Sequence, residues 1–111
     1  RATFAEIDLD SFRHNLHSIQ SLIGPDVGTM AIIKADAYGH GAIQCAHAAI
    51  EEQVDYIGVG IIQEGIELRE SGITSPILIL GGIYPNEIED LIKYNLSTSL
   101  SNSVIASAIS K

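Results

Sequence analysis

The stretch MAIIKADAYGHG, residues 30–41, joins a short apolar segment to a turn rich in glycine and in hydrogen-bonding side chains. Its first four residues are apolar and are typical of a short buried strand. Lys34 follows them directly, and Gly39 and Gly41 favour tight backbone turns and the close approach of a ligand. The stretch therefore predicts a lysine at the end of a buried strand. The fold and the function both depend on what surrounds it.

Helical and strand patterns alternate on both sides of this stretch. Asp10 is expected to cap a first helix, whose apolar residues recur at spacings of three and four up to Ile23. Gly72 is expected just past the end of a later helix and Pro85 at the start of another. The expected strands cover 29–33, 56–61, 77–80 and 97–100, and the helices that follow them cover 43–50, 63–72, 85–92 and 104–109.

The expected strands are near-continuous apolar runs, a pattern typical of a parallel sheet that is covered on its faces. Strand and helix alternate, and the later units recur at intervals of about 20 residues. Four such units form either a small open α/β sheet or the first half of a (β/α)8 barrel of the TIM type, and both interpretations stay open here. Neither GxGxxG nor GxxxxGK[ST] is present, which disfavours nucleotide binding. The chain reaches Lys111 inside a helical pattern, so we expect a fragment of a longer protein.

The composition disfavours several classes of protein. Apolar residues make up 46 % of the 111 residues, and their runs are far shorter than the roughly 20 residues that span a bilayer. Six basic residues stand against 14 acidic ones, and the net charge of −8 repels phosphate backbones. We therefore expect no membrane and no nucleic acid as partner. The single Cys45 cannot form a disulfide framework, and we expect a packed, reduced thiol in a cytoplasmic protein.

A lysine at the C-terminal end of a parallel strand lies where α/β folds bind ligands and where TIM barrels carry their catalytic groups. The apolar neighbours of Lys34 are expected to desolvate its amine, which favours nucleophilic attack on a carbonyl. Tyr38 offers a hydroxyl that could reach a phosphate. The alternative is a lysine that extends from the strand end into solvent. The residues alone do not separate these two interpretations.

The segment AIIKADAYGHG, residues 31–41, resembles the lysine signature of alanine racemases. These enzymes use pyridoxal 5'-phosphate (PLP) and consist of an (α/β)8 barrel and a second, mostly β domain. FAEIDLDSFRHN, residues 4–15, is similar to the opening segment of the family, and EGIELRESGITSPILILGG, residues 64–82, to its second helix and third strand. Asp36 stands where many members have asparagine, which leaves the assignment unchanged.

The resemblance implies roles for four residues. Lys34 holds the cofactor covalently through its amine and, once released, removes or returns the Cα proton on the D-alanine face. Tyr38 forms a hydrogen bond with the cofactor phosphate. Leu80 packs near the cofactor, although a plain core role fits the sequence equally well, and Ile32 contributes to the same wall. The cofactor ring takes up the electron pair left by the proton, so the protein supplies placement and electrostatics.

The resemblance also implies which parts of the enzyme lie outside residues 1–111. The second base is a tyrosine from the C-terminal domain of the partner subunit, and the arginine that faces the pyridine nitrogen comes from a later barrel strand. Residues 1–9 are expected to form a strand against that C-terminal domain, and residues 10–111 the first part of the barrel. The intact protein is then a homodimer that interconverts L-alanine and D-alanine for bacterial peptidoglycan, and residues 1–111 alone are expected to be inactive.

Other functions stay open on the sequence. One is a racemase with the same barrel that acts on serine or on a larger amino acid. Another is a non-catalytic protein that binds PLP, although such relatives lack AYGHG after their lysine. A third is a purely structural half-barrel that assembles through its open edges.

The remaining polar residues favour structural roles. His14 and His17 lie one helical turn apart without a third ligand nearby, so we expect them to face solvent and expect no metal site. His40 is expected to hold the turn after Lys34 by hydrogen bonds. A solvated, charged helix face is expected from Glu64, Glu67, Arg69 and Glu70.

Overall fold

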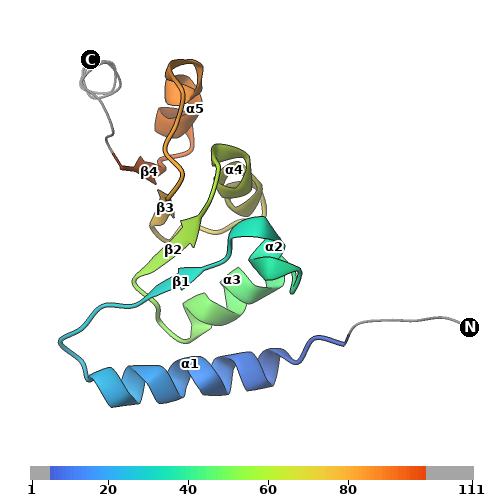
Figure 1. Ribbon diagram of the computed structural model, residues 1–111, viewed down its shortest axis with the longest axis vertical. Coiled ribbons are helices and arrows are strands. Elements are labelled where there is room, and N and C mark those ends of the chain that lie inside the picture. The colour runs from blue at the N-terminus through green and yellow to red at the C-terminus, as the bar shows by residue number, and fades with distance from the viewer. Residues whose placement is uncertain (1–5, 100–111) are drawn as a thin grey trace, which may run out of the picture.

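The computed structural model describes residues 6–99, which form a parallel four-stranded sheet with helices between its strands (Figure 1). Residues 1–5 of the expected N-terminal strand and the expected helix over 104–109 lie outside the described residues, and residues 6–8 belong to no helix or strand. The elements in chain order are α1 (Leu9–Ile23), β1 (Met30–Ile32), α2 (Lys34–Tyr38), α3 (Ala42–Glu51), β2 (Tyr56–Val59), α4 (Ile62–Glu70), β3 (Ile77–Ile79), the 3-10 turn η1 (Pro85–Glu87), α5 (Ile88–Lys93) and β4 (Ser97–Thr98).

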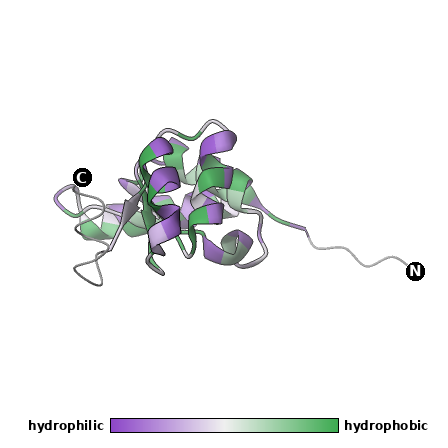
Figure 2. Ribbon diagram, turned by 90° about the horizontal axis from the view of Figure 1, so that it is seen from above, coloured by the Kyte–Doolittle hydropathy of each residue, from purple (hydrophilic) through white to green (hydrophobic). Residues whose placement is uncertain are grey.

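The alternation of strands and helices expected from the sequence is confirmed. Each of the four strands falls within its expected segment, and Pro85 begins η1, which leads into α5. The short α2 was not expected. The helices carry both hydrophilic and hydrophobic residues, as amphipathic surface helices do (Figure 2). Within residues 6–99, no helix combines the length and the apolar character needed to cross a membrane.

The caps of two helices test the expected helix boundaries. Gly72 follows the C-cap of α4 with a φ of +97°, as expected for a glycine that ends a helix. The expected cap of α1 is wrong by two residues. Asp8 is the cap, because its extended backbone lets the carboxylate accept hydrogen bonds from the Ser11 amide at 3.1 Å and the Ser11 hydroxyl at 2.9 Å. Asp10 lies in the first turn and pairs with Arg13.

The four strands lie side by side in chain order, β1-β2-β3-β4, and every pair is parallel. Ile32 is paired with Gly58, and Gly58 with Leu78. Helix α1 packs against α3 (Figure 1). The carboxyl ends of β1, β2 and β3 therefore meet at one edge of the sheet, which is where the candidate lysine lies.

One face of the sheet carries the core. Ile57, Val59, Ile77 and Ile79 are fully buried and pack in one cluster with residues of α3 and α4. On the other face the exposed fractions are 38 % for Met30, 38 % for Ile32, 41 % for Tyr56 and 41 % for Leu80. The expectation of a sheet covered on both faces is therefore wrong for the described residues. Helices on one face only are typical of a barrel, whose inner strand face points to the barrel interior, and not of an open doubly wound sheet.

Cys45 is 3 % exposed and unpaired, so the expected packed thiol is confirmed. Burial raises the pKa of the Cys45 thiol, and the negative charge of Asp36 raises it further. Since the thiolate is the reactive form, this cysteine is a structural residue and not a nucleophile.

Arg69 does not belong to a solvated helix face, contrary to the expectation. Its guanidinium is partly buried and donates hydrogen bonds to the carbonyls of Ser75 at 2.7 Å, Tyr94 at 2.8 Å, Ile73 at 3.0 Å and Asn95 at 3.0 Å. It ties the end of α4 to the segment before β3 and to the turn before β4. Glu67 and Glu70 are exposed as expected.

We expect Arg69→Lys to lower the free energy of unfolding by about 2 kcal/mol, because lysine cannot reproduce the planar fork and leaves partly buried carbonyls without donors. The matched control is Arg13→Lys, whose guanidinium pairs with the exposed carboxylates of Asp10 and Glu51 at 3.1 Å. The control should cost less than about 1 kcal/mol. Urea unfolding of both variants measures the difference, and equal losses would contradict the structural role of Arg69.

Candidate functional site

Lys34 lies at the carboxyl end of β1, on the face opposite to the core. The amide of Ile33 donates to the carbonyl of Gly58 at 2.8 Å and continues the pairing of β1 with β2. A Cβ added to Gly60 would lie 3.5 Å from Cβ and 3.9 Å from Cδ of Lys34, so the lysine stem runs beside a residue without a side chain. The side chain of Lys34 is exposed. The expected desolvation by its apolar neighbours is therefore wrong for the described residues, because Ile33 and Ala31 face the core and Met30 and Ile32 are themselves exposed.

The turn after Lys34 has an unusual backbone. Ala35, Asp36, Ala37 and Tyr38 have φ angles of 52°, 55°, 56° and 56°, so α2 is a left-handed turn. Each L-residue in this conformation costs about 1–2 kcal/mol, because its Cβ crowds the following carbonyl. In the sequence, Gly39 and Gly41 are the residues that favour a turn at this point. Two alanines and a tyrosine give no sequence signal for positive φ, and only Asp36 is of a residue type that adopts it more readily.

Several hydrogen bonds hold the left-handed turn in place. The Ala37 amide donates to the Ile33 carbonyl at 3.0 Å, and the Gly41 amide donates to the Asp36 carbonyl at 2.9 Å. The Asp36 carboxylate accepts from the Ala42 amide at 2.7 Å, at the start of α3. His40 Nδ1 lies 2.9 Å from the Ala37 carbonyl, which can only accept, so Nδ1 carries the proton. The expected role of His40 in holding this turn is confirmed.

Glu64 connects the turn to the neighbouring strand. Its Oε2 accepts a hydrogen bond from the Ala35 amide at 2.6 Å, and its Oε1 accepts from the amides of Gly60 at 2.7 Å and Ile61 at 3.1 Å. The expectation that Glu64 belongs to a solvated helix face is wrong, because its carboxylate is bound to backbone amides. Its position three residues into α4 after a strand is the sequence signal for a cap of this kind. The bond to Ala35 had no signal, because it joins residues 29 positions apart.

Ile32 and Leu80 are brought together on the face of Lys34. A Cβ added to Gly58 would lie 2.7 Å from Ile32 Cδ1 and 3.4 Å from Leu80 Cδ1, so both side chains lean over Gly58 from opposite sides. Leu80 directly follows β3, and its amide donates to the Val59 carbonyl at 2.7 Å. The two residues form an exposed apolar wall at the carboxyl ends of the strands. A plain core role for Leu80 is thereby disfavoured.

Tyr38 ends the left-handed turn and is 61 % exposed. Together with Ile32, it lines a pocket of about 480 Å³ between the segment before α1 and the turn. The described lining of this pocket includes neither Lys34 nor Leu80. The structure therefore groups Lys34 with Ile32 and Leu80 on one face, and Tyr38 is exposed at the end of the same turn.

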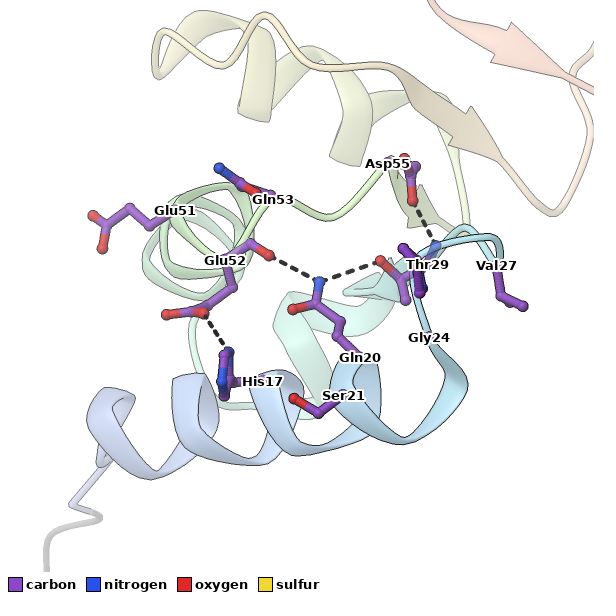
Figure 3. A pocket seen from close by; sticks show the side chains of 11 residues that line it. His17, Gln20, Ser21, Gly24, Val27, Thr29, Glu51, Glu52, Gln53 and Asp55 are labelled. Carbon is purple, nitrogen blue, oxygen red and sulfur yellow. Dashed lines mark hydrogen bonds and ion pairs between the residues drawn. The ribbon is translucent and has the colours of Figure 1, made fainter.

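A larger pocket, of about 630 Å³, lies at the opposite ends of the strands (Figure 3). Gln20 donates to the Glu52 carbonyl at 2.8 Å, and Asp55 accepts from the Thr29 amide at 2.7 Å. His17 lies 3.9 Å from the Glu52 carboxylate, and it is exposed, as expected. This pocket lies before the start of β1 and β2, and TIM barrels carry their active sites at the carboxyl ends of the strands, so we do not take it as the candidate active site.

Comparisons with known proteins agree with this geometry. A family model described as the N-terminal domain of alanine racemase matches residues 7–111. Alanine racemases of Synechocystis sp. and Geobacter sp. are 45 % and 47 % identical to the chain over 87 % and 90 % of its length. A solved alanine racemase structure from Clostridium difficile matches 98 % of the chain with a TM-score of 0.93 and 44 % identity.

The matched region is a minor part of these relatives. The chain covers 26 % of each of the two sequences and 29 % of the chain in the solved structure. The described strands and helices are the first units of a (β/α)8 barrel, as expected from the sequence. Since the family model covers nearly the whole chain, this protein belongs to the family of the alanine racemase N-terminal domain.

Proposed function

We propose that residues 1–111 form the first part of the barrel of an alanine racemase, a PLP-dependent enzyme that interconverts L-alanine and D-alanine. The observation that carries the proposal is the placement of Lys34, an exposed amine at the carboxyl end of β1 beside Gly60. TIM barrels carry their catalytic groups at this end of the strands. The names of the relatives support the substrate.

The residues around Lys34 fit PLP. A Cβ added to Gly81 would lie 2.5 Å from the Gly60 carbonyl oxygen, so the two glycines allow a close backbone approach and leave the lysine stem unobstructed. Bound PLP would supply an aldehyde for the Lys34 amine and a ring that takes up the electron pair left by the Cα proton. Lys34 holds the cofactor, and its released amine takes or returns that proton. Tyr38 donates its hydroxyl hydrogen bond to the phosphate, and Ile32 and Leu80 bound the site on its apolar side.

The complete site needs groups beyond these residues. The family resemblance implies that three groups come from elsewhere in the enzyme. They are a second base from the C-terminal domain of a partner subunit, an arginine that faces the pyridine nitrogen and most of the phosphate loop. The proposed enzyme is therefore a homodimer, and its proposed location is the cytoplasm, where D-alanine is needed for peptidoglycan precursors. The exposed inner face of the sheet, with Met30, Ile32 and Tyr56, supports a barrel that further strands complete.

Lys34→Ala in the intact racemase should abolish both the absorption of the lysine-bound cofactor and the interconversion of the alanine enantiomers, because no amine remains to hold the cofactor or carry the proton. The matched control is Lys93→Ala, which removes an exposed lysine on α5 that lies 5.2 Å from the Tyr94 ring centroid. The control should keep both properties. Racemisation by the Lys34 variant would exclude the proposed role, and a panel of amino acids tests the substrate.

Tyr38→Phe should weaken PLP binding about tenfold, because it removes one hydrogen bond to a charged phosphate and keeps the ring. Tyr84→Phe, at a tyrosine that is 74 % exposed in the segment before η1, is the matched control and should bind PLP like the wild type. Fluorescence titration of the apo-enzyme measures both dissociation constants. Equal affinity of the two variants would remove Tyr38 from the phosphate site.

Residues 1–111 produced by themselves should show no racemisation, because β1 is an edge strand of the sheet formed by the described residues and the proposed second base lies outside this chain. Polarimetry or a coupled D-alanine assay measures the rate. Turnover by the isolated chain would contradict the proposed division of the site between this chain and later segments.

A further inference from the structure

We infer that Glu64 is a positioning residue for the cofactor site: its carboxylate fixes the left-handed turn that carries Lys34 and Tyr38. This inference rests on the proposed function, since it concerns how the PLP-binding groups are held. Glu64 lies on α4, and it touches neither side chain through any hydrogen bond found in the described residues. It acts through the backbone.

The two oxygens of Glu64 serve two different loops. Oε1 binds the amides of Gly60 and Ile61, at the end of β2, and Oε2 binds the amide of Ala35, the residue after Lys34. One carboxylate therefore joins the carboxyl ends of β1 and β2 at the point where the lysine leaves the sheet. The distances of 2.6 and 2.7 Å for the two shortest bonds are typical of charge-assisted hydrogen bonds.

The bond to Ala35 acts at the start of the strained segment. Ala35 is the first of four consecutive non-glycine residues with positive φ, and Tyr38 is the last of them, directly before Gly39. If the Ala35 amide lost its acceptor, the turn could relax toward an ordinary backbone, and this would move the Lys34 amine and the Tyr38 hydroxyl together. Misplacement by about 1 Å is enough to impair a preorganised site.

A glutamine at this position cannot make all three hydrogen bonds of the carboxylate. The amide group of glutamine keeps one acceptor oxygen and replaces the other with an NH2 donor. Glu64→Gln must therefore lose either the Ala35 bond or the bonds to Gly60 and Ile61, and it sets a donor against an amide donor. The effect does not require any change in side-chain volume.

The test compares PLP binding with stability in the intact racemase. The variant is Glu64→Gln, and the matched control is Asp55→Ala, which removes a carboxylate bound to the Thr29 amide at 2.7 Å (Figure 3). Asp55 joins the same two strands at their opposite ends, so both variants should lower the thermal midpoint. Glu67→Gln, on the exposed side of α4, controls for the change of charge.

Titration of each apo-protein with PLP should give a dissociation constant about tenfold or more above wild type for Glu64→Gln, and within about twofold of wild type for both controls. If Glu64→Gln does not fold, Glu64→Asp replaces it. This shorter carboxylate can still cap α4 but retracts from Ala35, and it should weaken PLP binding in the same way.

Two results overturn the inference. The first is PLP binding by Glu64→Gln and Glu64→Asp that equals that of the wild type. The second is PLP binding by Asp55→Ala that is weakened as much as theirs, which makes the effect one of general stability. If the wild-type protein shows no absorption of lysine-bound cofactor, the proposed function is overturned, and the inference about Glu64 with it. If the wild type binds PLP and both Glu64 variants bind it equally well, only the inference about Glu64 is overturned.

Discussion

A chain of L-residues resists a left-handed helical turn because each Cβ crowds the following carbonyl, at a cost of about 1–2 kcal/mol per residue. Here four consecutive residues, none of them glycine, adopt that conformation directly after Lys34. The turn persists because its polar groups are held from three sides. The Ile33 carbonyl accepts a hydrogen bond from an amide within the turn. The Asp36 carboxylate accepts one from the amide at the start of α3, and the Glu64 carboxylate accepts one from the first amide of the turn. Backbone strain next to a reactive side chain is typical of a functional site that the surrounding structure over-determines.

The same edge of the sheet depends on three glycines, one within β2 and two just after the ends of β2 and β3. Gly58 gives space to Ile32 and Leu80, and Gly60 lies beside the Lys34 stem. Gly81 approaches the Gly60 carbonyl so closely that no Cβ fits between them. The apolar wall and the lysine therefore lie on one continuous surface at the carboxyl ends of β1, β2 and β3. That surface is the inner face of the barrel, because the helices cover the other face.

The burial pattern also decided between the two architectures that the sequence left open. Near-continuous apolar runs predict a sheet covered on both faces, yet Met30, Ile32 and Tyr56 are exposed on the inner face. In a closed barrel, apolar residues on both strand faces are consistent with helices on only one of them, because the inner residues pack against other strands. The apolar runs in the sequence indicate which strand residues avoid water. They do not indicate which part of the protein covers each of these residues.

The sequence by itself determined the order of strands and helices, the strand-end position of Lys34 and, through its resemblance to alanine racemases, the family. These follow from local patterns: apolar runs, a glycine after α4, a proline at η1 and a specific stretch around the lysine. The tertiary structure decided the left-handed turn, the carboxylate bond from Glu64 to Ala35 and the partly buried guanidinium of Arg69. Each of these depends on groups far apart in the chain or on strain that neighbouring elements balance. Glu64 and Arg69 resemble ordinary surface charges in sequence, and only the approach of backbone amides and carbonyls from other elements gives them their roles.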